Sequence, residues 1–424
     1  MSGRPRAAVV VTGSELVRGE RSDLNGPFLA RELVSLGFDV GKIAIVGDDP
    51  GDLGRELAAA LDAELVVTSG GLGPTHDDRT VELVAAASGR GLRVDETLAA
   101  EIEAVSRGIA ERLRRPYADF EAGVRKQATL PEGAVAIGLA GTAPGLLLED
   151  DGRVVVVLPG PPRELQRLWP NALQTEAMRR LLGRTQPPGR RVLRFFGASE
   201  SAVAKALADA GGDGNGVEAT ICAREFEIHV DLLVAPGAEK RADGLAEAIA
   251  APLERWLFSR DERTVEQLVL ELCRARRLTL ATAESCTGGM VAARLTDVPG
   301  SSDVFLGGIV AYSDELKRLE LGVPEEVLVA HGAVSPETAA AMSHGARRAL
   351  GADVAVSITG VAGPGGGTPE KPVGLVHVHA AGPDGERTLE LSIPGDRGAV
   401  RNRATVTALH LVRRLLTRDR HEAA

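Results

Sequence analysis

The first third of this chain alternates short apolar runs of strand length with amphipathic stretches of helix length. Arg6–Thr12, Val40–Val46 and Glu64–Thr68 are predicted as strands, and residues 24–36 and 52–61 as helices between them. Strands that alternate with helices at this interval predict a parallel sheet whose two faces are both covered. Ligands of such sheets bind beyond the C-terminal ends of the strands. The pattern therefore limits both the fold class and the place of a site.

The same alternation returns in the last part of the chain, from about residue 264 to residue 418. Gln186–Gly189 is the clearest linker signal, and residues 190–259 after it are predicted as strand, helix, two strands and helix. A chain of 424 residues also exceeds the usual domain size of about 100–200 residues. We predict the α/β class, with two three-layer α/β domains of mostly parallel sheets joined by a small α+β domain.

The composition argues against several classes of protein. A net charge of -10 speaks against a nucleic-acid partner. Three cysteines without a CxxC pair support neither a zinc ribbon nor a disulfide framework, and they favour a reducing environment. No run approaches the roughly 18 apolar residues of a membrane helix, and the N-terminus leads into an apolar strand rather than a signal peptide. We expect a cytoplasmic protein without a membrane partner.

A serine stands where a predicted strand runs into a helix, at Ser285 in the segment TLATAESCTGGM. The glycines after it let backbone N–H groups approach a reacting atom, and the start of a helix adds positive potential. Lys317 and a glycine-rich segment, Gly360–Gly367, follow later in the chain. This combination predicts hydrolysis of a small phosphorylated molecule through a serine nucleophile. The simpler alternatives are that Ser285 caps a helix and that Lys317 is a solvated surface lysine.

These motifs resemble the CinA family, the competence/damage-inducible proteins, over nearly the full length. The C-terminal resemblance lies in AESCTGG around Ser285, VAYSDELK ending at Lys317, HGAVS ending at Ser335 and GVAGPGGG from Gly360. Family members more often have Asn where this chain has Asp314. The N-terminal resemblance lies in GERSDLN, ending at Asn25, and in GGLGPTHDD, which begins at Gly70.

The resemblance implies a domain plan and two activities. Residues 1–172 would form a molybdopterin-binding-type domain with metal-dependent ADP-ribose pyrophosphatase activity, and residues 173–259 a KH-type domain. After a linker at 260–264, residues 265–424 would form a nicotinamide-nucleotide amidase domain. The chain would then be a bifunctional enzyme of pyridine-nucleotide salvage, acting on nicotinamide mononucleotide (NMN) and ADP-ribose, and it would be a homodimer.

For the amidase, a serine hydroxyl needs a base, and Lys317 is the candidate because no histidine lies in the Ser285 motif. Burial or a nearby cation lowers a lysine pKa enough for this role. Cys286 is the alternative nucleophile, although no partner histidine is evident. The remaining candidates are Tyr312 and Thr359 for substrate positioning or proton relay, and the N–H groups of Thr287, Gly288 and Gly289 for the oxyanion.

The 5′-phosphate of the substrate needs donors. Arg397 and Arg401 are one helical turn apart and can reach the same anion. The loop that contains Gly363, Gly365 and Gly366 can supply backbone N–H groups. The alternatives are that the arginines pair with carboxylates of a neighbouring helix and that the loop is a plain surface turn. His331 and His344 have no ligand partners at metal spacing, so we expect them to be structural.

For the pyrophosphatase, a divalent cation would neutralise charge on the phosphate oxygens. Mg²⁺, Co²⁺ or Mn²⁺ would take oxygen ligands, for which Asp77, Asp78 and Glu15 are the candidates. The predicted nucleotide-binding residues are Asp23, Asn25, Gly70, Gly71, Gly73 and Thr75. The alternatives are a helix-capping aspartate, a solvated Glu15, and a first domain that binds a pterin or nucleotide without turnover. The middle segment would bind RNA only in that alternative reading, since its loop at 211–216 is acidic rather than basic.

Overall fold

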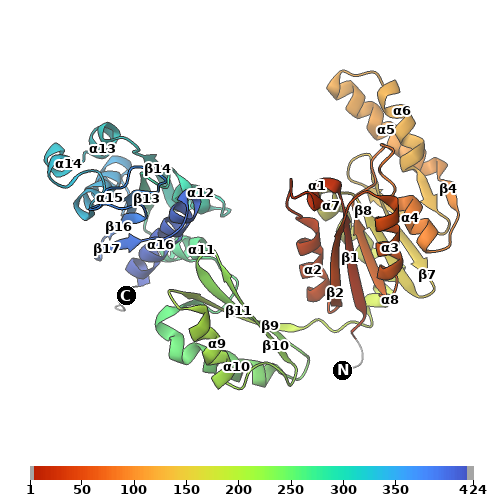
Figure 1. The fold of residues 1–424 in the computed structure, drawn as a ribbon, viewed down its shortest axis with the longest axis horizontal. Coiled ribbons are helices and arrows are strands. Elements are labelled where there is room, and N and C mark those ends of the chain that lie inside the picture. Colours follow the sequence, from red (N-terminus) through yellow and green to blue (C-terminus); the bar gives the residue numbers. More distant parts are fainter. Residues whose placement is uncertain (1–3, 418–424) are drawn as a thin grey trace. The chain divides into compact units, whose positions relative to one another are not determined.

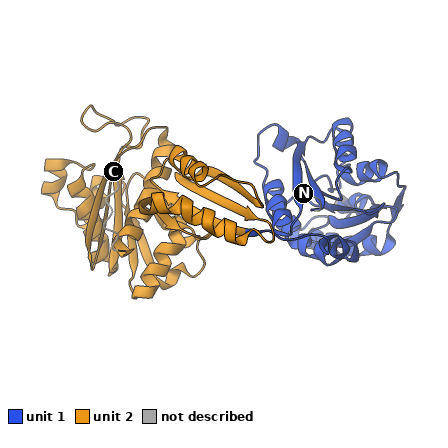
Figure 2. Ribbon diagram, turned by 90° about the horizontal axis from the view of Figure 1, so that it is seen from below, with its two compact units in different colours: residues 1–189 blue, residues 190–424 orange. Residues whose placement is uncertain are grey.

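The computed structural model describes residues 4–417 and divides into two compact units, residues 1–189 and 190–424 (Figure 2). The chain ends at 1–3 and 418–424, which the predicted domain ranges include, lie outside the described residues. Within residues 4–417, no helix combines the length and apolar character needed to cross a membrane.

The first unit is a three-layer α/β structure around a six-stranded sheet of order β2-β1-β3-β8-β7-β6 (Figure 1). Side chains of β1 alternate between its two faces. Val9 and Val11 pack in one apolar cluster with Leu29 and Leu165, whereas Val10 packs in the other with Leu53 and Ile102. A strand buried on both faces needs such a continuous apolar run. The strands are β1 (Arg6–Thr12), β2 (Asp39–Val46), β3 (Leu65–Ser69), β6 (Val135–Leu139), β7 (Pro144–Asp150) and β8 (Arg153–Leu158), with a separate pair of β4 (Leu92–Val94) and β5 (Thr129–Pro131).

The helices of this unit are α1 (Ser14–Val17), α2 (Asn25–Ser35), α3 (Pro50–Ala60), α4 (Thr80–Ala87), α5 (Glu96–Leu113), α6 (Ala118–Gln127), α7 (Pro162–Gln174) and α8 (Glu176–Leu182). Asp49 caps α3 by accepting from two backbone N–H groups. The predicted boundary after residue 172 is wrong, because it falls inside α7. Met178 and Leu181 of α8 belong to the core of the first unit, which therefore extends to residue 189.

Residues 190–259, the start of the second unit, form a four-stranded sheet of order β10-β11-β9-β12 with its own apolar cluster. The predicted order of strand, helix, two strands and helix is present, followed by a short 3₁₀ helix and a further strand. The KH type of this part stays a prediction. The elements are β9 (Gly189–Phe196), α9 (Glu200–Asp209), β10 (Val217–Arg224), β11 (Glu227–Val234), α10 (Glu239–Ala250), η1 (Ala251–Trp256) and β12 (Leu257–Ser259).

The rest of the second unit is again a three-layer α/β structure, around a five-stranded sheet of order β14-β13-β15-β16-β17. Its sheet is mixed rather than mostly parallel, because β15–β16 and β16–β17 pair antiparallel through a hairpin that the sequence pattern did not reveal. The strands are β13 (Leu280–Glu284), β14 (Phe305–Val310), β15 (Val354–Gly360), β16 (Leu375–Gly382) and β17 (Gly385–Ser392). The helices are α11 (Val265–Arg276), α12 (Met290–Thr296), η2 (Ser301–Asp303), α13 (Asp314–Leu321), α14 (Glu325–His331), α15 (Pro336–Leu350) and α16 (Arg397–Thr417).

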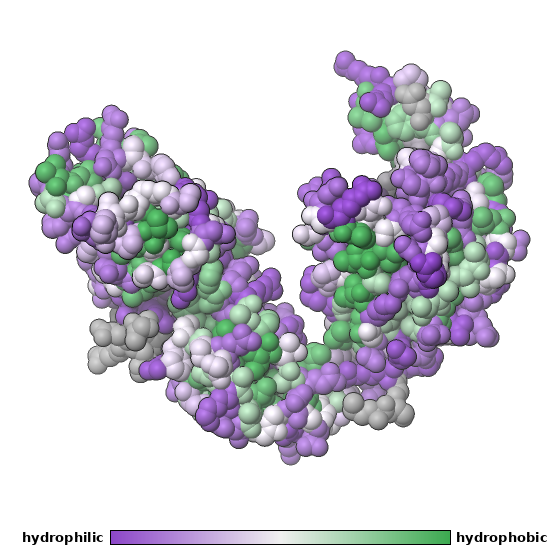
Figure 3. Space-filling model, in the orientation of Figure 1, coloured by the Kyte–Doolittle hydropathy of each residue, from purple (hydrophilic) through white to green (hydrophobic). Residues whose placement is uncertain are grey.

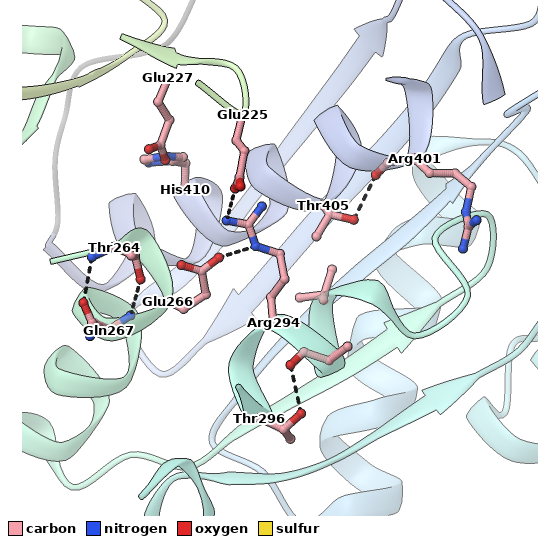
Figure 4. Close-up of polar contacts among 12 residues, drawn as sticks. Glu225, Glu227, Thr264, Glu266, Gln267, Arg294, Thr296, Arg401, Thr405 and His410 are labelled. Atoms are coloured by element: carbon pink, nitrogen blue, oxygen red, sulfur yellow. Dashed lines mark hydrogen bonds and ion pairs between the residues drawn. The ribbon is translucent and has the colours of Figure 1, made fainter. Parts of the chain in front are cut away.

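Polar contacts join the two parts of the second unit (Figure 4). Glu227 of β11 accepts from His410 of α16 at 2.7 Å, and the His410 ring stacks on Phe196 with 3.8 Å between ring centroids. Arg294 of α12 pairs with Glu225 at 2.9 Å and also with Glu266. A cavity of about 690 Å³ lies beside these residues, lined by side chains from both parts. Helix α16 is buried from Ala404 to Leu416, including Arg413 and Arg414, whereas its first turns are more exposed.

On the face in Figure 3, apolar residues of the first unit lie among the polar surface. Ile43 and Ile45 of the edge strand β2 are 42% and 47% exposed, and Leu24, just before α2, is 63% exposed. Lys42 directly precedes Ile43 on the same strand and pairs with Glu56. A charged lysine on an edge strand discourages uncontrolled pairing with other chains.

Candidate active site

Ser285 lies directly after β13, a strand with a neighbour on each side in the sheet. Its N–H donates to Ile358 O of β15 at 2.9 Å, and its carbonyl accepts from Gly288 N–H at 3.1 Å. Gly288 and Gly289 have φ of 61° and 94°, a region that favours glycine, and α12 starts at the next residue. The strand, tight turn and helix expected from the sequence are therefore present, with the serine 7% exposed at the C-terminal end of the strand.

Glu284 is a residue of this turn that the sequence analysis missed. Its side chain is 1% exposed and accepts from three N–H groups at the start of α12: Gly289 and Ala292 at 2.9 Å and Val291 at 3.1 Å. A carboxylate at this place satisfies donors that a helix start leaves free, and its charge suits the helix dipole. The signal in the sequence was an acidic residue immediately before the serine.

Two of the three predicted oxyanion donors are consequently occupied. Gly289 N–H bonds to Glu284, and Gly288 N–H bonds to the Ser285 carbonyl. Within residues 4–417, no hydrogen bond uses Thr287 N–H. We therefore revise the oxyanion assignment to Thr287 alone.

Arg401 of α16 fixes the same turn from the other side. Its Nε donates to Cys286 O at 3.1 Å, and an outer guanidinium nitrogen donates to Thr287 O at 2.8 Å. We expected this side chain at a phosphate. It instead holds two carbonyl groups of the serine turn, which makes it a positioning residue.

Arg397, one turn earlier in α16, connects two of the predicted motifs. It donates to Gly363 O at 2.8 Å and to the Tyr312 hydroxyl at 3.1 Å. Tyr312 is 59% exposed, and Gly365 and Gly366 lie in the exposed part of the glycine loop. The loop, the tyrosine and α16 therefore meet beside the serine turn, and this meeting point has an exposed side.

Lys317 of α13 is almost fully buried, at 1% exposure, which excludes the solvated-lysine alternative. Burial lowers its pKa, while the carboxylate of Asp314, 3.6 Å from the Lys317 amine, acts in the opposite direction. Three residues before α13, the N–H of Ala311 donates to Glu284 O at 2.9 Å, so α13 follows a strand end that lies against the serine turn. None of the hydrogen bonds in the described part of the chain joins it to the Ser285 hydroxyl.

Two other predicted roles change. Burial raises the pKa of the Cys286 thiol to about 11, so the thiol is not ionised near neutral pH and is a poor nucleophile. Thr359 is 1% exposed and donates its hydroxyl to Ala333 O at 2.6 Å. It ties the HGAVS segment to β15 and is not placed as a proton relay.

In the first unit, polar residues gather at the C-terminal ends of β1, β3 and β8. Gly70 and Gly71 have φ of 105° and 66°, and a Cβ on Gly70 would lie 2.4 Å from Thr12 O. Asn25 donates to Ser69 Oγ at 2.8 Å and to Gly160 O at 2.7 Å. Its Oδ1 is buried and has no hydrogen-bond partner among the described residues. A buried free acceptor next to a glycine turn fits a ligand that donates a hydrogen bond.

Asp23, expected at ribose or adenine, accepts from the N–H groups of Asn25 at 2.8 Å and Gly26 at 3.1 Å. It therefore orders the start of α2. Asp48, which we missed, accepts from Thr12 Oγ1 at 3.0 Å and from Ser14 Oγ at 2.7 Å. These contacts link the ends of β1 and β2.

The predicted metal ligands do not form one set. Asp78 accepts from the N–H of Thr75 at 3.0 Å and also from its hydroxyl, and a Cβ on Gly73 would press against the same carboxylate. Glu15 is exposed and turns toward Gly13. In the described residues, Glu15, Asp77 and Asp78 are not among the groups of three ligand atoms close enough to share an ion. The residues present do not fit a three-carboxylate magnesium site.

Two family models match the chain: the CinA C-terminal domain over residues 262–416 and the probable molybdopterin binding domain over residues 8–179. A CinA-like protein of Mycolicibacterium gilvum is 44% identical over 97% of this chain and 99% of its own length. The chain belongs to the CinA family. Another CinA-like protein, from Mycobacterium tuberculosis, is 43% identical over 98% of this chain and 99% of its own. Among solved structures, a competence/damage inducible protein of Agrobacterium tumefaciens is 40% identical over 37% of this CinA-family chain and 99% of its own, with a TM-score of 0.35.

Proposed function

We propose that the C-terminal domain of this CinA-family protein hydrolyses the carboxamide of NMN to nicotinate mononucleotide and ammonia. The observation that carries the proposal is the buried Lys317 on a helix that follows a strand end bonded to Glu284, beside a serine turn fixed by Glu284 and Arg401. A serine on a tight turn with an amine base is the minimal apparatus for amide hydrolysis.

The proposed reaction has two steps. Ser285 Oγ attacks the carboxamide carbon while the neutral Lys317 amine takes its proton. Collapse of the tetrahedral intermediate breaks the C–N bond, and the lysine returns the proton to the leaving nitrogen, which departs as ammonia. Water then attacks the resulting ester, with the same lysine as base, and nicotinate mononucleotide leaves. Thr287 N–H is the donor for the oxyanion in both steps.

The test is ammonia release from NMN by the purified full-length protein. Ser285→Ala and Lys317→Ala should each lose at least ~10³-fold in kcat, as for other nucleophile and base deletions. Ser302→Ala and Lys240→Ala change exposed residues of the same unit and serve as matched controls. Activity at the wild-type level in either S285A or K317A would reject the mechanism.

We propose that the first unit binds a nucleotide at the glycine turn, with ADP-ribose as the candidate substrate. The unpartnered Asn25 Oδ1 supports a ligand there. Because Glu15, Asp77 and Asp78 do not meet, no step is assigned to a metal. The assay is pyrophosphate cleavage of ADP-ribose with and without Mg²⁺, Co²⁺ or Mn²⁺, alongside equilibrium binding. Binding without cleavage under all metals would favour a binding module over a pyrophosphatase.

Two further proposals concern assembly. We propose a homodimer, supported by the exposed apolar residues of β2, and light scattering at several concentrations tests it. We also propose a structural role for residues 190–259, because Glu227 and Glu225 join this part to α16 and α12. A salt-dependent shift of RNA by the full chain would contradict that role.

A further inference from the structure

Three potential metal ligands from separate elements meet on the last sheet of the second unit. His344 belongs to α15 and His379 to β16, and Glu386 is the second residue of β17. Their ligand atoms all lie within 4.8 Å of one another. From the sequence we expected no metal-ligand partners for His344, because the hairpin that brings the other two residues to it was not predicted.

The distances suit a tetrahedral ion. His344 Nε2 lies 3.2 Å from Glu386 Oε1, and His379 Nε2 lies 3.3 Å from Glu386 Oε2. An ion with metal–nitrogen distances of about 2.0–2.1 Å separates neighbouring ligand atoms by about 3.3 Å. Each histidine nitrogen is therefore at about this separation from one oxygen of the Glu386 carboxylate.

Ser343 gives His379 an outer hydrogen bond. Its Oγ lies 2.7 Å from His379 Nδ1 and 2.9 Å from Ala340 O. The hydroxyl has one hydrogen. When that hydrogen goes to Ala340 O, Oγ accepts from His379 Nδ1–H, and Nε2 presents a lone pair toward the carboxylate. The lone pair of Nε2 and the negative carboxylate of Glu386 repel each other, and a cation between them would be coordinated by both. An outer hydrogen bond like that of Ser343 commonly orients a metal-bound histidine.

The burial of the three side chains also fits a site with an entry route. The His379 side chain is 3% exposed. The side chains of His344 and Glu386 are 35% and 49% exposed. One ligand is thus fixed inside the protein and two are reached from solvent.

We propose that His344, His379 and Glu386 bind one divalent ion of the zinc class, with the fourth position open to water or another small ligand. Two imidazoles and one carboxylate select zinc, cobalt or nickel over magnesium, which prefers oxygen ligands and water. The ion would fasten the edge strand β17 to α15. This site shares no ligand with the serine turn or with the first unit.

Co²⁺ titration of the untagged full-length protein, in excess Mg²⁺, tests the proposal. We expect one equivalent to give the intense visible absorption of tetrahedral cobalt, and Zn²⁺ to displace it. His344→Gln and Glu386→Gln should each weaken binding at least ~10-fold, and Ser343→Ala by about 10–100-fold, as for outer partners of metal ligands.

His331→Gln is the matched control, because His331 pairs with Glu337 at 3.5 Å outside the cluster, and it should bind cobalt as the wild type does. Circular dichroism checks that each variant is folded. Absence of tetrahedral absorption in the wild type would overturn the proposal. Equal binding by H344Q, E386Q and the wild type would overturn it as well, and would place the ion elsewhere.

Discussion

Glu284 accepts the N–H of Gly289 at 2.9 Å, so the residue before the serine holds the glycine that ends the serine turn. Together with the bonds to Val291 and Ala292, this places a buried carboxylate beneath the start of α12. The shape of the turn therefore depends on a side chain that need not touch the substrate.

The first prediction follows from this bond. Glu284→Gln replaces an acceptor oxygen with an N–H₂ group that faces backbone N–H donors, so we expect a loss of about 1–3 kcal/mol in the free energy of unfolding. The kcat for ammonia release should fall as well, because the serine is misplaced. Urea denaturation and the NMN assay measure the two effects. Glu320→Gln, at an exposed position of α13, is the control; equal stability of both variants would contradict the assigned role.

A second prediction concerns the base. The Asp314 carboxylate raises the pKa of Lys317 against the lowering effect of burial. Asp314→Asn removes that influence, so the lysine pKa falls further and the amine is neutral at lower pH. The acid limb of kcat/KM against pH should therefore move to lower pH. Glu315→Gln changes the adjacent exposed carboxylate and should leave the limb in place, whereas a shift to higher pH in D314N would refute the base assignment.

The third prediction separates positioning from phosphate binding. Arg401→Lys leaves a positive charge but loses the paired donors to Cys286 O and Thr287 O. We expect kcat to fall by about 10–100-fold with little change in KM, because a misplaced nucleophile loses rate rather than affinity. A rise in KM at constant kcat would instead indicate that Arg401 binds the substrate phosphate. Steady-state kinetics with NMN distinguish the two results.

The alternation of apolar runs was sufficient to predict the α/β class and the strand-to-helix turn at Ser285, since both depend on local sequence. The hairpin of β16 and β17 was not predicted, because β17 is an edge strand whose side chains alternate between exposed and half-buried. The cluster of His344, His379 and Glu386 depends on that hairpin and was missed with it.

Long-range side-chain partners were equally hidden. Arg401 lies 115 and 114 residues along the chain from Cys286 and Thr287, whose carbonyls it binds. The spacing of Arg397 and Arg401 is equally compatible with a phosphate and with a backbone carbonyl as the acceptor of their hydrogen bonds. The same holds for the carboxylates of the first unit. A glycine turn predicts where the backbone bends, but it does not predict that the Asp78 carboxylate accepts a hydrogen bond from Thr75.

The fourth prediction concerns acid stability of the second unit. Burial lowers the pKa of His410 to about 4, whereas the same side chain takes up a proton near 6.5 when unfolded. Between these values the unfolded chain binds more protons, so this histidine makes stability fall as the pH drops from about 6.5 to 4. Hydrogen bonds from His229 and His410 outweigh burial and lower the pKa of Glu227 to about 2, so its own contribution is lost only below about pH 4.5.

His410→Gln removes the titrating ring, and the glutamine amide still has a donor for Glu227. Urea denaturation at pH 7.5, 6.5, 5.5 and 4.5, values chosen to lie above and between the two histidine pKa values, should therefore show a shallower pH dependence in H410Q than in the wild type. His331→Gln changes a half-exposed histidine near the end of α14 and should retain the wild-type slope. If H410Q loses stability with falling pH as steeply as the wild type, the pH dependence belongs to other groups, and the buried pair of His410 and Glu227 does not control it.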